Sequence, residues 1–515
     1  MRRSRAPLAL LFLLGCGTVA QAPDAQVSAP LDAASPADDA ASPPDAGTPP
    51  VDAGRDDVIA VAHRRELRAV WVATVYGIDF PSRAGLSASA ARAELSAIVD
   101  RVASVGGNAI FFQVRPESDA LYRSAHEPWS RFLAGTQGTD PGYDPLAVLL
   151  ELAHARGLEV HAWMNPYRGL ASASTSAHSS HVTRTLAEHA VPYGAGVWMD
   201  PGAPAVRAHV VAVVRDLLEH HAVDGVHFDD YFYPYPDEAG TPFDDDASWQ
   251  AYVEGGGAME RADWRRENVN ALVREVMATV REVRPAARFG ISPFGIHRPG
   301  MPAGIRGLDA YATLYCDALA WIDEGTVDYV APQLYWPTTQ TAQAYGPLAA
   351  WWAAQTIDGI HLFPGHALHR LGSSDAWSID ELRAQIELTR TLHAEGAQGD
   401  VLFSYSQLEE DRLGVTSLLS ELWAAPALPP AVPRALAAPE PPRVTLAGTA
   451  LSITHDARDA LRGFALYRDD TEGPILDRLL ASDTTTLEVD PSERWLVSAV
   501  ANGDVESLGA IPSAP

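Results

Sequence analysis

The sequence contains no lysine and only two cysteines, Cys16 and Cys316, among its 515 residues. Two cysteines are too few for a framework of disulfide bonds. Positive charge is scarce as well, because 38 arginines face 66 acidic residues and the formal net charge is −28. Proteins that bind nucleic acids use cationic side chains to neutralise phosphates, so we expect no nucleic acid partner.

Motifs of several common enzyme classes are also missing. The sequence has no Gly-x-Ser-x-Gly motif and no P-loop, which argues against a serine hydrolase and against a nucleotide-binding enzyme. His178 and His181 have the spacing of two ligands on a helix, but they lie in a serine-rich stretch and no glutamate accompanies them as in zinc proteases. We therefore expect neither a metal ion nor another cofactor.

The N-terminus has the layout of a secretory signal. Three arginines fall within the first five residues, and the apolar run at residues 8–14 is too short to span a membrane as a mature helix. Leu13-Leu14-Gly15-Cys16 resembles a bacterial lipobox, which predicts that residues 1–16 are a lipoprotein signal and that Cys16 is acylated. An ordinary signal peptide with an incidental cysteine is the alternative. Acylation predicts secretion across the inner membrane and a lipid anchor in the cell envelope; Gly17 favours the outer membrane in a Gram-negative host.

Residues 17–57 are mostly alanine, proline, aspartate, serine and glycine. Such a segment cannot bury enough apolar surface to fold, and its prolines keep it extended. We expect a disordered linker that holds the following domain away from the membrane. The second cysteine, Cys316, lies in a stretch with helical character at residues 311–324, where we expect it to be a buried, small hydrophobic side chain.

From residue 66 to about 425, apolar β-rich runs alternate with amphipathic helical runs. Eight such pairs predict an α/β fold in which residues 58–436 form a (β/α)8 TIM barrel. A doubly wound sheet is the alternative, but it seldom reaches eight parallel strands, and no glycine-rich phosphate turn follows the first strand. The expected strands are residues 67–74, 109–114, 158–164, 225–229, 289–294, 329–335, 360–365 and 401–405.

The pattern changes after residue 436, where several prolines precede short β-like runs separated by turn residues. Residues 437–515 therefore predict a small β-sandwich. The segment at residues 494–503 resembles the last hairpin of a fibronectin type III domain. The proline-rich linker further predicts that the barrel folds without this C-terminal domain.

The active site of a TIM barrel lies at the carboxyl ends of its strands. The fourth strand ends in His227-Phe228-Asp229-Asp230-Tyr231. The two-residue period of a strand places His227 and Asp229 on the inward face, with Asp230 at the start of the loop. Adjacent carboxyl groups beside aromatic rings are costly to bury unless they are used; a helix cap or a loop ion pair is the alternative for each.

The second strand ends with Gln113 and Arg115 on one face, followed by Glu117 and Asp119 in the loop. In a barrel mouth, the amide and the guanidinium can bind sugar hydroxyls or orient carboxylates. Glu117 and Asp119 are candidate partners of the strand-four carboxylates. A structural ion pair that braces the loop is the alternative for Asp119.

Further strand ends carry the mixture of acids, amides, histidines and large aromatic rings that sugar recognition requires. Other polar residues at strand ends are Asp79, Ser292, His366 and His369. The expected substrate-binding residues are Trp71, Gln113, Arg115, Trp163, Asn165, Tyr167, Arg168, His227, Tyr231, His297, Gln333, Tyr335 and Trp336.

Six segments in order carry a family resemblance: RAVWVAT at residues 68–74, QVRPESDA at 113–120, AWMNPYR at 162–168, GVHFDDY at 225–231, SPFG at 292–295 and APQLYW at 331–336. Over residues 64–425 the chain resembles the glycosyl-hydrolase-like family ten, formerly a domain of unknown function. The resemblance implies a barrel and frequent lipoprotein anchoring. For at least one enterobacterial relative it also implies cleavage of peptidoglycan glycan strands that have lost their stem peptides.

Together these observations predict a glycoside hydrolase that acts on a cell-surface polysaccharide, with peptidoglycan glycan as the expected substrate. A glycosidase needs two carboxyl groups. We expect Asp229 and Asp230 to be catalytic, with Glu117 and Asp119 competing for the role of second partner. A non-catalytic cell-wall-binding lipoprotein and a polysaccharide deacetylase, which would require a metal ion, are the alternatives.

Overall fold

The structure, a computed structural model, describes residues 57–356, 359–434, 436–471 and 473–514. The expected signal peptide (residues 1–16) with Cys16, and all of the expected linker except Asp57, lie outside the described residues. In the part of the chain that is described, no helix is both long and apolar enough to cross a membrane.

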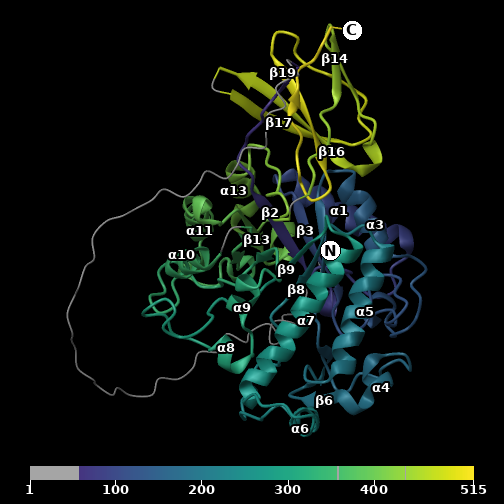
Figure 1. The fold of residues 1–515 in the computed structure, drawn as a ribbon, viewed down its shortest axis with the longest axis vertical. Coiled ribbons are helices and arrows are strands. Elements are labelled where there is room, and N and C mark those ends of the chain that lie inside the picture. Colours follow the sequence, from purple (N-terminus) through teal and green to yellow (C-terminus); the bar gives the residue numbers. More distant parts are fainter. Residues whose placement is uncertain (1–56, 357–358, 435, 472, 515) are drawn as a thin grey trace, which may run out of the picture.

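The centre of the molecule is a parallel sheet that curls into a barrel (Figure 1). Its strand order is β11-β10-β9-β8-β4-β3-β2-β13-β12. The terminal strands β11 and β12 are consecutive pieces of one stretch of chain, and β11 pairs with β10 while β12 pairs with β13. The sheet therefore closes on itself. The strands are β2 (Leu67–Val72), β3 (Ala109–Arg115), β4 (Glu159–Met164), β8 (Gly225–Phe228), β9 (Arg288–Ile291), β10 (Tyr329–Val330), β11 (His361–Leu362), β12 (Gly365–His366) and β13 (Gly399–Leu402).

Each strand sends alternate side chains to two different cores. Ala69, Trp71 and Phe111 belong to an inner cluster on the barrel axis, whereas Val226 and Phe228 belong to the large core under the helices. The main outer helices are α1 (Ala88–Ser104), α3 (Pro145–His154), α5 (Pro204–His220), α7 (Arg261–Val283), α10 (Tyr345–Gln355), α11 (Ile379–Thr391) and α13 (Val415–Leu422). The predicted (β/α)8 architecture is confirmed.

Local sequence explains where the helices begin. In α1 the Ser87 hydroxyl accepts a hydrogen bond from the amide of Ala90, and Leu95, Ile98 and Val102 recur at helical spacing on the buried face. The helices that connect the strands lie around the barrel (Figure 1). They bury the outer face of the barrel and leave its two ends, where the strands begin and where they finish, uncovered by these helices.

The expected helix around Cys316 differs from the prediction. The structure has two short helices, α8 (Ala310–Thr313) and α9 (Ala318–Asp323), with Cys316 between them. Asp317 caps the second helix by accepting a hydrogen bond from the amide of Ala320, at 3.3 Å. This cap starts a new helix instead of continuing the old one. Cys316 is buried, as expected.

An antiparallel sheet follows β4 at the carboxyl end of the barrel and was not predicted. It has the order β5-β7-β6, built from β5 (Arg168–Leu170), β6 (Ala190–Tyr193) and β7 (Gly196–Met199). Its short strands fall in a segment rich in serine and alanine, which hides the alternation of a strand. The insertion forms a wall beside the candidate site.

The C-terminal domain consists of two antiparallel sheets with the orders β14-β15-β18 and β1-β20-β19-β16-β17. Ile453 from the first sheet and Phe464 and Val497 from the second share one apolar core, as a sandwich requires. Strand β1 comes from residues 58 and 59, which precede the barrel. The strands are β14 (Arg443–Ala447), β15 (Ala450–Thr454), β16 (Leu461–Asp470), β17 (Gly473–Ala481), β18 (Thr486–Glu488), β19 (Trp495–Ala501), β20 (Gly509–Ala510) and β1 (Val58–Ile59).

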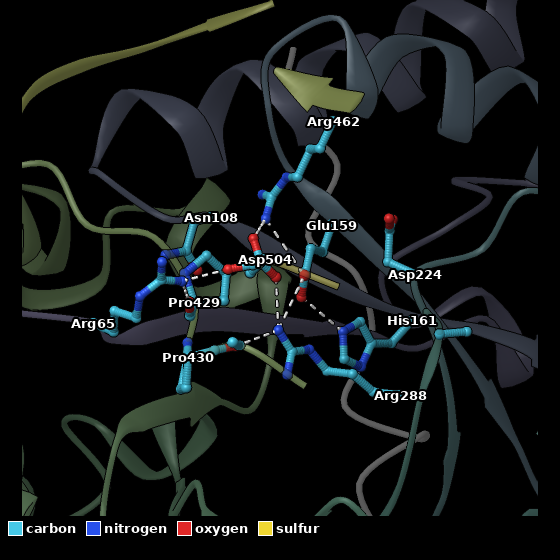
Figure 2. Close-up of polar contacts among 12 residues, drawn as sticks. Arg65, Asn108, Glu159, His161, Asp224, Arg288, Pro429, Pro430, Arg462 and Asp504 are labelled. Carbon is cyan, nitrogen blue, oxygen red and sulfur yellow. Dashed lines mark hydrogen bonds and ion pairs between the residues drawn. The ribbon is translucent and has the colours of Figure 1, made fainter. Parts of the chain in front are cut away.

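The C-terminal domain covers the end of the barrel at which the strands begin. Figure 2 shows Asp504 and Arg462 of this domain beside Glu159 and Arg288, the first residues of β4 and β9. Arg288 donates to Asp504 Oδ2 at 2.6 Å and to the Pro430 carbonyl at 2.5 Å. Arg462 bonds the other oxygen of Asp504. The opposite end of the barrel stays open for the candidate site.

Candidate active site

A cavity of about 80 Å³ lies at the carboxyl ends of the strands. Two carboxyl groups, Asp229 and Asp230, face it together with other polar groups and a ring of aromatic side chains. The polar groups are Ser292, Gln333 and His369, and the aromatic residues are Trp71, Trp163, Tyr231, Tyr235, Phe294, Tyr335 and Phe403. Residues from most strands of the barrel thus meet at one point, as they do in enzymes with this fold.

Asp229 directly follows β8 and points toward the side of β4. Its Oδ2 accepts hydrogen bonds from Trp163 Nε1, at 3.1 Å, and from Asn165 Nδ2, and its Oδ1 accepts one from the amide of Tyr231, at 3.2 Å. Asp229 is buried. These donors fix the direction of the carboxyl group before any substrate arrives.

Asp230 turns toward the other side of the cavity. Its Oδ1 accepts a hydrogen bond from Gln333 Nε2, at 3.0 Å, and its Oδ2 accepts one from the Tyr235 hydroxyl. Gln333 is oriented in turn by Ser292, whose hydroxyl lies 3.2 Å from Gln333 Nε2. The two adjacent aspartates are therefore held by different strands.

Both carboxyl groups hold protons more tightly than ordinary aspartates. Burial raises the pKa of Asp229 to about 7, and the neighbouring Asp230 adds to this shift, while Arg168 opposes it. Burial raises the pKa of Asp230 to about 6, against hydrogen bonds from Tyr235 and Gln333. Near neutral pH the pair therefore contains one proton and one negative charge, a state suited to acid–base chemistry.

Asn165 connects Asp229 to the neighbouring strand ends. Its Oδ1 accepts hydrogen bonds from Gln113 Nε2, at 2.8 Å, and from Arg168 Nη2, at 2.9 Å. Two donors to this oxygen leave the amide nitrogen directed at Asp229. Gln113, itself outside the cavity lining, thus acts on the site by orienting Asn165.

A chain of buried hydrogen bonds runs down the barrel axis beneath the cavity. Trp71 donates to His227 Nε2 at 3.2 Å, and His227 Nδ1 lies 3.1 Å from the Tyr329 hydroxyl. The same hydroxyl lies 2.9 Å from His161 Nδ1, and His161 Nε2 lies 3.1 Å from Glu159. Burial lowers the pKa of His227 well below its ordinary value. Because Trp71 can only donate, neutral His227 carries its proton on Nδ1.

Glu117 and Asp119, the other candidate catalytic residues, do not line the cavity. Glu117 is buried and accepts two hydrogen bonds from Arg131, at 2.8 and 3.0 Å. Asp119 is buried and accepts one from Gln137, at 3.0 Å. Arg115 is also engaged elsewhere, in a two-bond ion pair with Glu127 at 2.6 and 2.8 Å. These ionisable groups brace the loop after β3.

The expected binding residues other than Gln113 and Arg115 divide into three groups. Trp71, Trp163, Tyr231, Gln333 and Tyr335 line the cavity. Arg168 lies beside it, and Asn165 and His227 support it from behind. Outside the cavity lining, Tyr167 is fully buried in the core, the His297 ring stacks on Trp351, and Trp336 packs on Phe294.

Five cavity residues were not among the expected binding residues: Ser292, His369, Tyr235, Phe294 and Phe403. Phe403 follows Val401 by two positions, so the strand period alone could have placed it on the barrel axis. Tyr235 lies in the loop after β8, where no period applies. In the described part of the chain, no group of three or more histidine, cysteine, aspartate or glutamate side chains is arranged to hold a metal ion.

The chain is similar to known proteins over most of its length. It is 39% identical over 447 residues to the glycosyl hydrolase YngK of Bacillus subtilis, covering 82% of this chain and 86% of that protein. It is 33% identical over 390 residues to the glycosyl hydrolase DigH of Escherichia coli K12, covering 70% of this chain and 88% of that protein.

Among solved structures, the glycoside hydrolase domain of PgaB (BpsB) from Bordetella bronchiseptica aligns with a TM-score of 0.43 and 15% identity, covering 69% of this chain and 98% of that domain. The family model described as glycosyl hydrolase-like 10 matches residues 66–380, which span the barrel strands β2 to β12 and the cavity residues Asp229 and Asp230. The chain therefore belongs to the glycosyl hydrolase-like 10 family.

Proposed function

We propose that this protein is a glycoside hydrolase that cleaves O-glycosidic bonds of a cell-surface polysaccharide with Asp229 and Asp230. One observation carries the proposal: two buried carboxyl groups with raised pKa values meet in one aromatic-lined cavity at the carboxyl ends of the barrel strands. A glycosidase needs one carboxylic acid and one carboxylate on the two sides of the bond, and the pair supplies both near neutral pH.

The chemistry follows from the shared proton. The protonated carboxyl group donates its proton to the oxygen of the leaving sugar as the bond from that oxygen to the anomeric carbon breaks. The carboxylate stabilises the positive charge that develops on the sugar ring, either by attack on the anomeric carbon or by activation of a water molecule. Water supplies the hydroxyl group of the new reducing end, and its second proton restores the acid.

The substrate of the proposal is the glycan strand of peptidoglycan. The sequence motifs imply this substrate through the family resemblance, and the cavity supports a sugar ligand on chemical grounds. Trp71, Trp163 and Tyr335 offer aromatic faces for the apolar side of a sugar ring. Gln333 and Ser292 offer polar groups for its hydroxyl or amide substituents.

A product assay tests the proposal. Purified peptidoglycan glycan strands without stem peptides are incubated with the protein and analysed by size and for released acetate. Shorter chains with new reducing ends support the proposed hydrolase. Release of acetate without chain shortening would indicate a deacetylase, and retention of the strands without any product would indicate a binding protein; either result would overturn the proposal.

We further propose that the protein is anchored in the cell envelope through an acylated Cys16. The support is the lipobox-like Leu13-Leu14-Gly15-Cys16 after a short apolar run. Metabolic labelling with a fatty acid is expected to mark the wild-type protein and to miss Cys16→Ser. Equal labelling of both would disprove the anchor.

A further inference from the structure

A second hollow of about 200 Å³ lies next to the catalytic cavity. Tyr231 and Tyr235 line both spaces, so the two are neighbours across this pair of rings. One wall of the second hollow is the loop after β2, which carries Tyr76, and the other is the β5–β7 insertion, which carries Leu170 and Trp198. The hollow therefore continues the cavity sideways along the barrel mouth.

Tyr76 is held in an unusual position at the edge of this hollow. Tyr76 is 41% exposed, and its backbone has a φ of 56°, in the left-handed region that residues other than glycine seldom adopt. The loop is fixed there because Gln113 Oε1 accepts hydrogen bonds from the amides of Thr74 and Val75, both at 2.9 Å. An exposed aromatic ring on strained backbone is typical of a ligand-binding position.

Glu117 holds the two walls of the hollow together from behind. One wall is reached through Arg131, which Glu117 binds with both oxygens and whose guanidinium lies 5.7 Å from the centre of the Tyr76 ring. The other wall is reached through Ala171, whose amide donates to Glu117 Oε1 at 2.8 Å. The spacing between the walls therefore depends on a carboxylate that is itself fully buried.

The chemistry of the hollow suits a sugar chain. Its lining joins aromatic rings to a guanidinium, Arg168, which lies 5.2 Å from the centre of the Tyr231 ring and bonds Asn165 behind Asp229. Rings bind the apolar faces of sugars, and the cation binds hydroxyl, amide or carboxylate oxygens. Because the hollow adjoins the catalytic cavity across Tyr231 and Tyr235, the ligand that fits it is the continuation of the chain being cleaved.

We propose that this second hollow binds the sugar units on one side of the cleaved bond, with Tyr76 as a stacking platform, so that the enzyme prefers long glycan chains. The inference rests on the proposed glycoside hydrolase function and adds a specificity site to it. Glu117 is then a positioning residue that fixes the Tyr76 wall and the Ala171 wall relative to each other.

The test uses full-length protein and peptidoglycan glycan strands without stem peptides, separated by length. Tyr76→Gly removes the ring and suits the left-handed backbone. Leu413→Gly is the matched control, because Leu413 is also exposed, has a φ of 54°, and lies in neither hollow. We expect Tyr76→Gly to lower kcat/KM for long strands about tenfold more than for the shortest strand cleaved, and Leu413→Gly to preserve the wild-type ratio.

Glu117→Gln separates the positioning role of Glu117 from a role in catalysis. We expect the variant to raise KM for long strands and to reduce the preference for them. Loss of a catalytic carboxyl group would instead lower kcat on strands of every length. Equal effects of Tyr76→Gly on all lengths would disprove the proposed role of the hollow while leaving the proposed hydrolase function intact.

Binding measurements keep the two proposals distinguishable. If the wild-type protein cleaves no strand, the proposed function fails, but titration calorimetry still tests the hollow. Long strands must then bind more tightly than short ones, and Tyr76→Gly must remove this difference. Unchanged binding of long strands by Tyr76→Gly would by itself disprove the proposed role of the hollow.

Discussion

Asp504 and Arg288 form an ion pair of 2.6 Å in which both side chains are almost completely buried. Asp504 belongs to the C-terminal domain, and Arg288 is the first residue of barrel strand β9. Glu159 lies 3.5 Å from the same guanidinium nitrogen and is the last acceptor of the hydrogen-bonded chain that descends from Trp71. The floor of the barrel thus depends on a carboxyl group supplied from outside it (Figure 2).

Removal of this carboxyl group is predicted to be costly. Asp504→Ala leaves Arg288 and Arg462 beside Glu159 alone, so we expect a loss of about 3–5 kcal/mol of stability, as for other broken buried pairs. Urea unfolding followed by circular dichroism measures it. Asp456→Ala is the control, because the Asp456–Arg443 pair is exposed, with side-chain exposures of 80% and 67%; its expected cost is below about 1 kcal/mol. Similar costs for both variants would contradict the prediction.

The same contacts bear on the expectation that the barrel folds alone. A chain ending at residue 436 lacks Asp504 and Arg462, and it leaves Arg288 and Glu159 at an uncovered floor. Proline-rich linkers suggest independence because they are locally extended. They carry no information about ion pairs between residues 216 positions apart, such as Arg288 and Asp504.

The two-residue period of strands predicted much of the site. It placed His227 and Asp229 on the barrel axis and Gln333 and Tyr335 at its mouth, since a buried strand must alternate its faces. The period fails where the chain leaves the strand. Nothing in the sequence around Glu117 indicates that Arg131 forms an ion pair with it. A structural carboxylate and a catalytic carboxylate therefore cannot be told apart in the sequence at this position.

Edge strands show a second limit of prediction. Strand β17 (Gly473–Ala481) is difficult to recognise in the sequence, because Asp477 and Arg478 interrupt its apolar residues. Such charges are common on edge strands, where they discourage pairing with other chains. Strand β17 lies at the edge of its sheet. The charges that discourage pairing with other chains therefore also make the strand difficult to recognise in the sequence.

Substitution of the paired aspartates tests the chemistry. Asp229→Asn and Asp230→Asn keep the size and much of the hydrogen bonding but remove the charge and the exchangeable proton. We expect each to lower kcat on glycan strands by on the order of 100-fold or more, with a smaller change in affinity. Melting curves control for folding. Near-wild-type turnover of both variants would place the catalytic site elsewhere.

The pH dependence of kcat/KM follows from the same pair. Below about pH 6 Asp230 becomes protonated and the carboxylate is lost, whereas above about pH 7 Asp229 loses its proton and the acid is lost. We therefore expect a bell-shaped profile with its maximum between these values. Arg168 lowers the pKa of Asp229, so Arg168→Gln should move the alkaline limb to higher pH. An alkaline limb that stays fixed or moves to lower pH would show that a group other than Asp229 causes it.

The last prediction concerns Asp119, which is buried outside the cavity. Burial raises its pKa to about 7, and the charge of Glu117 contributes to the shift. A carboxyl group whose pKa is higher in the folded state than in the unfolded state, where it is about 3.9, stabilises the fold fully at pH values below the unfolded pKa. This contribution is lost as the pH rises through the folded pKa.

The substitution Asp119→Asn removes this loss, because an asparagine side chain titrates in neither the folded nor the unfolded state. Relative to the wild type, the variant should gain about 1.4 kcal/mol per pH unit between about pH 4 and pH 7, and the difference should then level off. Urea unfolding at a series of pH values measures it, and turnover on glycan strands should stay within a few-fold of the wild type because Asp119 is absent from the cavity lining. A stability difference that does not change with pH would contradict the raised pKa of Asp119. A turnover as low as that of Asp229→Asn would show that Asp119 takes part in catalysis.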